Sequence, residues 1–313
     1  MSEHLLDVQN LRVSFDTYAG EVQAVRGVSF YIDKGETLAI VGESGCGKSV
    51  SIQTVMGLLP MPPARIKEGH IYYEGKDLTT LTDKQMENYR GKEFSMIFQD
   101  SMTSLNPTMR VGRQMVEAIL VHQKISREEA REHAISLLGK VGLPEPEKVF
   151  KRYPHTMSGG QRQRVMIAMA MACNPKILFA DEPTTALDVT MQAQILDLMR
   201  NLKDKINSSI MLITHDLGVI AEMADYVVVM YAGRVVEKGT ASEIFKNPSH
   251  PYTIGLMRSK PVVGKKVDKL YSIPGKVPNP IDMPDYCYFR DRCELSCDKC
   301  QGSYPGVIKL SPT

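Results

Sequence analysis

The sequence lacks an apolar run long enough to cross a membrane. Its longest apolar stretches, Ile210–Thr214 and Tyr226–Ala232, have the length of strands, whereas a membrane helix needs about 20 residues. It also lacks an export signal, because Met1–His4 shows no basic segment ahead of an apolar core. We therefore expect a cytosolic chain, which needs other chains to span a membrane if it works at one.

The chain also has no excess of charge of either sign. Its 38 lysines and arginines stand against 36 aspartates and glutamates, for a formal net charge of +2, which argues against electrostatic binding of nucleic acid. With 43% hydrophobic and 24% charged residues, the composition is typical of a globular protein, and 313 residues suggest about two domains. No repeat or low-complexity tract indicates a solenoid.

Residue patterns predict an α/β fold. Leu5–Phe15 and Val22–Ile32 alternate apolar and polar residues around a turn at Ala19-Gly20, which indicates an antiparallel layer. Three continuous apolar runs predict strands buried on both faces, with a helix from Lys48 to about Leu59 and another over about 190–205. This alternation is typical of a parallel sheet covered by helices. The three runs are Thr37–Val41, Ile177–Ala180 and Ile210–Thr214.

Two further segments depart from this alternation. Apolar residues at helical spacings predict an inserted helical subdomain over about residues 101–160. Beyond Gly239 prolines become frequent, which predicts a C-terminal quarter rich in loops. We therefore divide the chain into a main domain at 1–240 and a C-terminal extension at 241–313.

Residues 42–49 fit the phosphate-binding pattern G-x-x-x-x-G-K-[ST]. They follow a predicted buried strand and precede a predicted helix, where glycine turns aim backbone N–H groups at phosphate oxygens. Lys48 is expected to bind the β- and γ-phosphates, and the Ser49 hydroxyl to ligate Mg²⁺. Cys46 is interpreted as a small filler. The residues predicted to bind nucleotide here are Gly42, Glu43, Ser44, Gly45, Cys46, Gly47, Lys48, Ser49 and Val50.

Three polar residues follow predicted strands further along. Asp181 and Glu182 end a buried run, at the edge where open α/β sheets bind ligands. Asp181 is predicted to hold Mg²⁺ through water, and Glu182 to orient or deprotonate the attacking water. His215 follows the run that ends at Thr214, and we expect it to sense the γ-phosphate and hold the attacking water.

A second anion-binding device is predicted at the start of another helix. Met157-Ser158-Gly159-Gly160-Gln161 opens a helix expected to run to about Cys173. Two half-sites in one chain suggest a dimer. The segment closely resembles the L-S-G-G-Q signature of ATP-binding-cassette (ABC) ATPases, with Met157 in place of the usual leucine.

The resemblance extends along the chain in the family's order. It implies that Gln99 is the glutamine-loop residue, which ligates Mg²⁺ together with Ser49 and Asp181 and takes part in catalysis. It implies that Ala186-Leu187-Asp188 crosses the dimer. The implied fold is a P-loop NTPase cassette with a RecA-like parallel-sheet core, an antiparallel β layer and an inserted α-helical subdomain, followed here by a small Cys-rich appendage.

Phe15 matches the family's aromatic position that stacks on adenine. The hairpin at Asp16–Gly20, which carries Tyr18, lengthens the separation of Phe15 from Gly42.

A narrower resemblance is to the ATPase subunits of oligopeptide and dipeptide importers. It rests on Gln99–Pro107, on His250-Pro251-Tyr252-Thr253 and on the cysteine-bearing C-terminal segment. It implies an ATPase at the cytoplasmic face of the cell membrane that energises peptide import. The implied partners are a second ATPase subunit, identical or related, two transmembrane permease subunits and an extracytoplasmic substrate-binding protein. Nickel and other small-solute importers share these features, so the cargo stays open.

By this resemblance, two cassettes close head to tail on ATP. Each ATP would lie between Gly42–Ser49 of one cassette and Ser158–Gln161 of the other, and hydrolysis would let the pair reopen. The helices after Gln99 would transmit the motion to the membrane partners.

Four of the 6 cysteines lie close together near the C-terminus, with the spacing C-x₅-C-x₃-C-x₂-C. Four thiolates without a nearby histidine suit Zn²⁺ or an iron–sulfur cluster, and a cytosolic chain disfavours disulfides. Peptide-importer ATPases look similar at three of these positions. Because the spacing is unlike the paired C-x₂-C of a zinc ribbon, we favour a structural [4Fe–4S] cluster, with Zn²⁺ as the alternative. The cysteines are Cys287, Cys293, Cys297 and Cys300.

Other classes of protein fit the sequence less well. A DNA-repair or chromosome ATPase of this family would need a long coiled-coil insertion or DNA-binding zinc modules, and a translation-factor type carries two cassettes in one chain. A non-enzymatic iron–sulfur regulator with a vestigial cassette conflicts with the complete set of Lys48, Asp181, Glu182 and His215.

Overall fold

The computed structural model describes residues 4–99, 104–185, 187–259 and 271–311. Asp100–Thr103 and Ala186, which carry parts of two predicted motifs, lie outside the described residues. The chain forms two compact units. The terminal unit comprises Met1–Ile32, Leu38–Thr80 and Thr214–Thr313, and the middle unit comprises Asp33–Thr37 and Leu81–Ile213.

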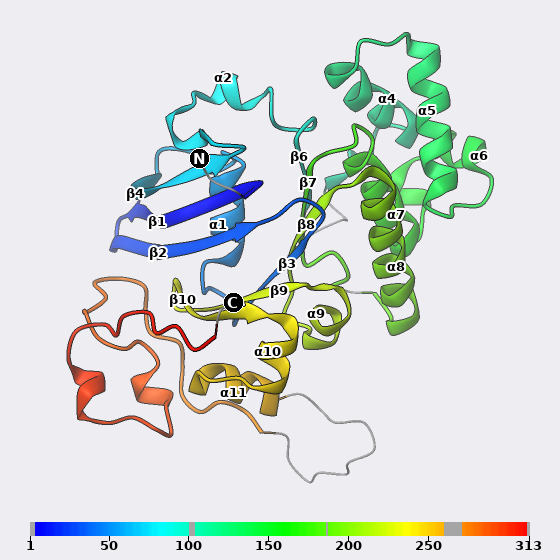
Figure 1. The fold of residues 1–313 in the computed structure, drawn as a ribbon. Helices are drawn as coiled ribbons and strands as arrows, with labels where there is room; N and C mark the ends of the chain where they lie inside the picture. The colour runs from blue at the N-terminus through cyan, green and yellow to red at the C-terminus, as the bar shows by residue number, and fades with distance from the viewer. Residues whose placement is uncertain (1–3, 100–103, 186, 260–270, 312–313) are drawn as a thin grey trace. The chain divides into compact units, whose positions relative to one another are not determined.

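The terminal unit contains an antiparallel sheet in the order β2-β1-β4-β5 (Figure 1). The long strands β1 and β2 form a hairpin whose pairing closes at Thr17 opposite Gly20, which confirms the predicted antiparallel layer. Sequence patterns missed β4, because its charged and glycine residues interrupt the alternation. The strands are β1 at Leu6–Thr17, β2 at Gly20–Ile32, β4 at Ala64–Tyr73 and β5 at Lys76–Asp77.

A second group of strands, which apart from Thr37 belongs to this unit, carries the phosphate loop at residues 42–49. β3 (Thr37–Val41) runs parallel to β9 (Tyr226–Tyr231), and every residue of both strands is buried. β9 also pairs antiparallel with β10 (Arg234–Thr240). Helix α1 (Lys48–Val55) follows β3 and packs on β1 and β2, behind them in Figure 1. It ends before the predicted Leu59, because Gly57 adopts φ 62°, a conformation common just after a helix.

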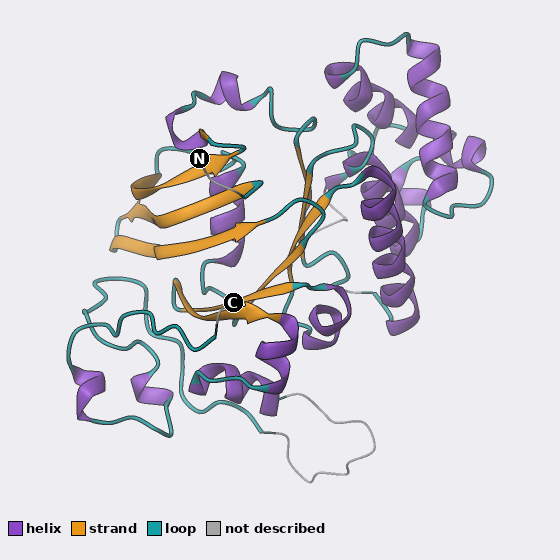
Figure 2. Ribbon diagram, in the orientation of Figure 1, coloured by secondary structure: helices purple, strands orange, loops and turns teal. Residues whose placement is uncertain are grey.

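The C-terminal quarter begins with helices and only then becomes rich in loops (Figure 2). Helix α9 (Leu217–Met223) precedes β9, and α10 (Ala241–Lys246) and α11 (Pro251–Arg258) follow β10. The later residues contain the short turns η3 (Arg290–Arg292) and η4 (Asp298–Gln301). They join the terminal unit through the Gln23 N–H, which donates to the Pro280 carbonyl oxygen at 3.0 Å.

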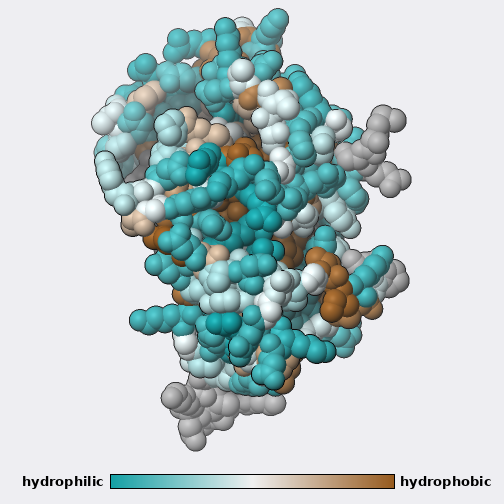
Figure 3. All heavy atoms as spheres, turned by 90° about the vertical axis from the view of Figure 1, so that its left-hand side faces the viewer, coloured by the Kyte–Doolittle hydropathy of each residue, from teal (hydrophilic) through white to brown (hydrophobic). Residues whose placement is uncertain are grey.

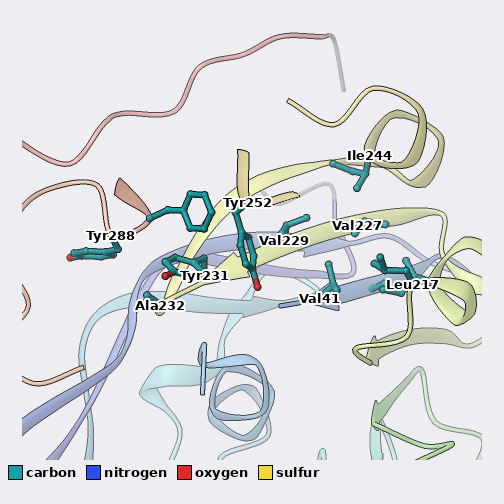
Figure 4. Packing of buried hydrophobic residues seen from close by; sticks show 12 residues of the cluster. Val41, Leu217, Val227, Val229, Tyr231, Ala232, Ile244, Tyr252 and Tyr288 are labelled. Atoms are coloured by element: carbon teal, nitrogen blue, oxygen red, sulfur yellow. The ribbon is translucent and has the colours of Figure 1, made fainter. Parts of the chain in front are cut away.

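A mainly aromatic and aliphatic cluster forms the core of this region (Figure 4). Tyr231 of β9 and Tyr252 of α11 have ring centroids 4.7 Å apart, and Phe289 meets Tyr231 edge-on at 5.2 Å. Both tyrosines are fully buried. Residues from the C-terminal quarter therefore complete the packing around β9.

The middle unit contains three parallel strands in the order β8-β7-β6, each buried along most of its length. The predicted strands at 177–180 and 210–214 correspond to β7 and β8, whereas β6 was not predicted. The strands are β6 at Phe94–Ile97, β7 at Ile177–Asp181 and β8 at Ser209–Ile213.

Helices make up most of the rest of the middle unit. Helices α4, α5 and α6 pack on one another within the segment predicted to be helical. On α4, Val111, Met115 and Ile119 are fully buried, which is the four-residue repeat of an amphipathic helix. α7 ends at Ala170, short of the predicted Cys173. The helices are α2 at Asp83–Met86, α4 at Val111–His122, α5 at Arg127–Lys140, α6 at Pro146–Lys151, α7 at Gly159–Ala170 and α8 at Val189–Ile206.

The helices lack the character of membrane spans. In the part of the chain that the structure describes, none is both long enough and apolar enough to cross a bilayer.

The side of the molecule shown in Figure 3 is largely hydrophilic, with hydrophobic residues in separate spots.

Candidate functional site

The phosphate loop, residues 42–49, joins β3 to α1 in the terminal unit. Two positions of this loop, Gly42 and Gly47, leave no room for a side chain. A Cβ on Gly42 would lie 2.1 Å from the Met230 carbonyl oxygen, and one on Gly47, at φ +94°, would lie 2.5 Å from the Ala24 carbonyl oxygen. α1 begins at Lys48, directly after Gly47, which has no side chain to cap the helix. The first N–H groups of α1 can therefore donate to a phosphate.

Lys48 lies inside this loop. Its side chain is buried, and Nζ donates to the carbonyl oxygens of Gly42 at 2.7 Å and Glu43 at 3.0 Å. Cys46 Sγ lies 3.7 Å from the same Nζ, and burial raises the pKa of its thiol, which agrees with a filler role. The other predicted binding residues are more open: Ser44 and Gly45 are exposed, and Glu43, Ser49 and Val50 are half-buried.

Asp181 and Glu182 lie at the carboxyl end of β7 in the middle unit. Asp181 is buried. Glu182 adopts φ 49°, and its N–H donates to the Ile213 carbonyl oxygen at 2.8 Å. Gln99 Nε2 and Thr185 Oγ1 both donate to Glu182 Oε2, at 2.9 and 3.0 Å. The structure thus brings together two of the residues predicted to be catalytic, Gln99 and Glu182.

The predicted Mg²⁺ ligands are Ser49, Gln99 and Asp181. They offer hydroxyl, amide and carboxylate oxygens, the donor type that Mg²⁺ prefers. Ser49 belongs to the terminal unit, and Gln99 and Asp181 belong to the middle unit. The donor chemistry fits the ion, and the assembly of the site stays a prediction.

Ser158–Gln161 forms the start of α7. Ser158 is the N-cap: its Oγ accepts from the Gln161 N–H at 3.3 Å, while Gln161 Oε1 accepts from the Ser158 N–H at 3.2 Å. This reciprocal pair is a capping box. A Cβ on Gly159 would meet no atom within 4 Å, whereas one on Gly160 would lie 2.4 Å from Met191 Cε. The helix start therefore leaves open space at Gly159, where the sequence predicts an anion.

The other predicted residues have varied surroundings. His215 is exposed just after β8 ends. Asp188 caps α8, because its Oδ1 accepts from the Met191 N–H at 2.9 Å. Phe15 is half-buried within β1, whereas Tyr18, in the turn of the β1–β2 hairpin, is fully exposed. Of these two aromatic residues, Tyr18 is therefore the more exposed to solvent.

The four C-terminal cysteines lie near one another without forming a metal site. Cys297 Sγ and Cys300 Sγ are 3.8 Å apart, and Cys287 and Cys293 pack against the aromatic cluster. Burial, and then the neighbouring Cys287, raise the pKa of the Cys293 thiol. Across the described ranges, no group of three or more His, Cys, Asp or Glu side chains is arranged to hold a metal ion. This arrangement does not support the predicted [4Fe–4S] cluster.

Sequence reasoning missed two residues that touch the phosphate loop. The Tyr252 hydroxyl accepts from the Glu43 N–H at 2.8 Å, and Arg292 donates to both carboxylate oxygens of Glu43, at 2.6 and 2.9 Å. Tyr252 lies in the His250–Thr253 segment that supports the narrower resemblance, but nothing in the spacing of these residues relates them to position 43.

These features define an ATPase with a P-loop and a separate signature helix. Residues 25–185 match the ABC transporter family, and residues 236–300 match the family described as oligopeptide/dipeptide transporter, C-terminal region. The chain therefore belongs to the ATP-binding proteins of oligopeptide/dipeptide ABC transporters, and it is an ATPase.

Curated relatives and a solved structure agree with this assignment. The chain is 56% identical over 310 residues to the oligopeptide transport ATP-binding protein OppD of Bacillus subtilis (strain 168), covering 99% of this chain and 87% of that one. It is 54% identical over 304 residues to the dipeptide transport ATP-binding protein DppD of the same organism, covering 97% and 91%.

The structure is similar to that of the dimeric ATP-binding cassette MJ0796 in a post-hydrolysis state bound to ADP and Pi. The TM-score is 0.68 and the sequences are 26% identical, over 75% of this chain and 98% of that one. This likeness supports the cassette fold across most of residues 1–313.

Proposed function

We propose that this chain hydrolyses ATP to energise the import of dipeptides or oligopeptides. The observation that carries the proposal is the match of residues 25–185 to the ABC transporter family, joined in one chain to a C-terminal region that matches oligopeptide/dipeptide transporters. The relatives named for oligopeptide and dipeptide transport, OppD and DppD, match this chain almost from end to end. Import of nickel or another small solute is the alternative.

The proposed chemistry uses the residues already placed. Residues 42–49 bind the phosphates of ATP, with Lys48 against the β- and γ-phosphates. When bound, Mg²⁺ neutralises phosphate charge, and Ser49, Gln99 and Asp181 are the residues that would hold it. Glu182 orients or deprotonates the attacking water, and the Gln99 amide holds the Glu182 carboxylate. His215 contacts the γ-phosphate, and the adenine stacks on Phe15 or on the exposed ring of Tyr18.

We further propose that two cassettes close on each ATP. The first backbone N–H groups of α7, behind the Ser158 cap, would meet the nucleotide held by the phosphate loop of the other cassette. Because ATP favours the closed state and ADP does not, hydrolysis would reopen the pair. The pairing of two cassettes is supported by the dimeric state of the similar cassette MJ0796. The partners are a second ATPase subunit, two permease subunits and a substrate-binding protein, with this chain at the cytoplasmic face of the membrane.

The domain division and the cysteine site also stay proposals. We propose a cassette at 1–240, with its helical subdomain at about 101–160, and an extension at 241–313 that holds the cysteines. Their number and spacing support a [4Fe–4S] cluster or, as the alternative, Zn²⁺.

Transport in the source organism tests the function. Cells whose genomic copy carries Glu182→Gln should lose uptake of a labelled dipeptide and a labelled tetrapeptide while keeping uptake of nickel. Cells with Glu147→Gln, a change at an exposed position in the first turn of α6, serve as the control and should import normally. Loss of nickel uptake with normal peptide uptake would replace the peptide proposal with the metal one.

A further inference from the structure

Glu43, the second residue of the phosphate loop, is held at three points. Its carbonyl oxygen accepts from Lys48 Nζ at 3.0 Å, its N–H donates to the Tyr252 hydroxyl at 2.8 Å, and its carboxylate accepts from Arg292. Only the first contact comes from the loop itself. The other two come from α11 and η3, in the C-terminal quarter of the chain.

Arg292 uses its whole guanidinium in this arrangement. Nη1 and Nη2 donate to the two carboxylate oxygens of Glu43 at 2.6 and 2.9 Å. Nε donates to the Pro274 carbonyl oxygen at 2.8 Å, and Nη2 also donates to that of Ile273 at 3.3 Å. The side chain is 5% exposed. The Glu43 side chain is 31% exposed, and the two parallel charge-assisted hydrogen bonds make the pair directional.

The Tyr252 side chain is held by aromatic packing. The residue is fully buried between Tyr231 and Phe289, with ring centroids 4.7 and 5.4 Å away. Figure 4 shows its ring within this cluster, next to Tyr231. The hydroxyl that receives the Glu43 N–H therefore has a position set by the packing of α11 against β9.

These contacts matter for a loop that binds phosphates. A carboxylate in such a loop repels the negative charge of ATP, and this repulsion is large where solvent is partly excluded. The guanidinium of Arg292 neutralises that carboxylate and holds it in one orientation. With its N–H and side chain both fixed, Glu43 directs its carbonyl oxygen to Lys48.

We propose that Arg292 and Tyr252 are positioning residues for nucleotide binding, which act through Glu43 on the phosphate loop and on Lys48. The proposal rests on the proposed function in one respect, that residues 42–49 bind ATP. Arg292 directly precedes Cys293, which packs against the same aromatic cluster. Arg292 therefore connects the cysteine segment to the phosphate loop through Glu43.

Titration of the full-length chain with a fluorescent ATP analogue tests this inference. Arg292→Gln should raise the Kd about tenfold, the ratio expected for the loss of one charge-assisted pair. The loss should shrink at high salt, because it comes from an unpaired carboxylate. Adding Glu43→Gln to Arg292→Gln should recover most of the affinity, which a purely structural role of Arg292 would not produce.

Tyr252→Phe removes only the hydroxyl and should raise the Kd several-fold, because the partly buried Glu43 N–H loses its acceptor. The matched control is Arg258→Gln, because Arg258 also pairs with a glutamate, Glu294, but in an exposed place; its Kd should stay at the wild-type value. If Arg292→Gln fails to fold, the Kd values of Arg292→Lys and Tyr252→Phe test the inference in its place: both should be raised.

Unchanged Kd values in the folded Arg292 and Tyr252 variants would overturn the inference, and so would a double variant no better than Arg292→Gln. A wild-type chain that fails to bind ATP would overturn the proposed function instead, so the two failures are distinguishable.

Discussion

Glu182 is the residue that we propose acts on the attacking water. Its carboxylate oxygen Oε2 accepts from Gln99 and from Thr185, and its backbone adopts φ 49° while bonded to Ile213. A non-glycine residue with positive φ persists only where neighbouring contacts hold it, and such residues cluster at functional sites. The local contacts therefore fix the side chain that we expect to act on water.

Replacing this carboxylate should separate ATP binding from ATP hydrolysis. We expect Glu182→Gln to keep ATP and trap the closed dimer, with hydrolysis reduced by about 10²- to 10⁴-fold, the usual contribution of a general base. Single-turnover hydrolysis and gel filtration with ATP and Mg²⁺ measure both effects. Thr185→Val removes one hydrogen-bond donor to the Glu182 carboxylate and should cause a smaller loss of hydrolysis. Unchanged steady-state hydrolysis in Glu182→Gln would refute the assigned role.

Among the structural elements, the start of α7 combines a structural role with a predicted binding role. Its capping box at Ser158 and Gln161 is matched by one at Ser126 and Glu129 on α5. Both serines are N-caps in exposed places. Only Ser158 lies in the signature segment, so the pair separates the effect of a helix cap from an effect on the nucleotide.

Ser158→Ala and Ser126→Ala should each lower the free energy of unfolding by about 1 kcal/mol, the usual cost of a lost N-cap. Chemical denaturation measures that loss. Only Ser158→Ala should also reduce ATP hydrolysis in the assembled dimer. An equal reduction in both variants would show that Ser158 acts as a cap alone.

At the scale of structural elements, the sequence predicted three strands in which every residue is buried and missed β4, in which buried and exposed residues are mixed. β3, β7 and β8 are buried at every residue, so their apolar runs predicted them. Exposed and buried residues follow one another irregularly along β4. It forms a strand because it pairs with β1. α10 and α11 were not predicted because proline was interpreted as loop, although Pro251 lies in the first turn of α11, where proline is tolerated.

At the scale of the whole molecule, the C-terminal quarter is part of the terminal unit that carries the phosphate loop. Tyr288 packs beneath Arg26 of β2 and Arg234 of β10, with the guanidinium carbons 5.0 and 5.6 Å from its ring centroid. Tyr304 lies beside Tyr288, and burial raises its pKa to about 12. Aromatic and cationic side chains therefore anchor the cysteine segment to β2 and β10.

Metal analysis of the full-length chain decides what the thiols hold. We expect an anaerobic preparation to be brown and to contain iron and sulfide, and Cys293→Ser to lose both and to lower the Tm. Cys173→Ser, at a half-buried cysteine outside the segment, should change neither. A colourless protein with stoichiometric zinc would establish the alternative, and a metal-free, stable protein would exclude a structural metal.

The sequence by itself determined the class of chemistry, because a phosphate loop and a signature helix start depend on local backbone geometry and contiguous residues. Gly42, Gly47 and Lys48 were predictable for this reason. Only the tertiary structure decided which distant side chains complete the site. The pairing of Gln99 with Glu182, and of Arg292 and Tyr252 with Glu43, results from packing between segments far apart in the chain, and such packing leaves no local pattern in the sequence.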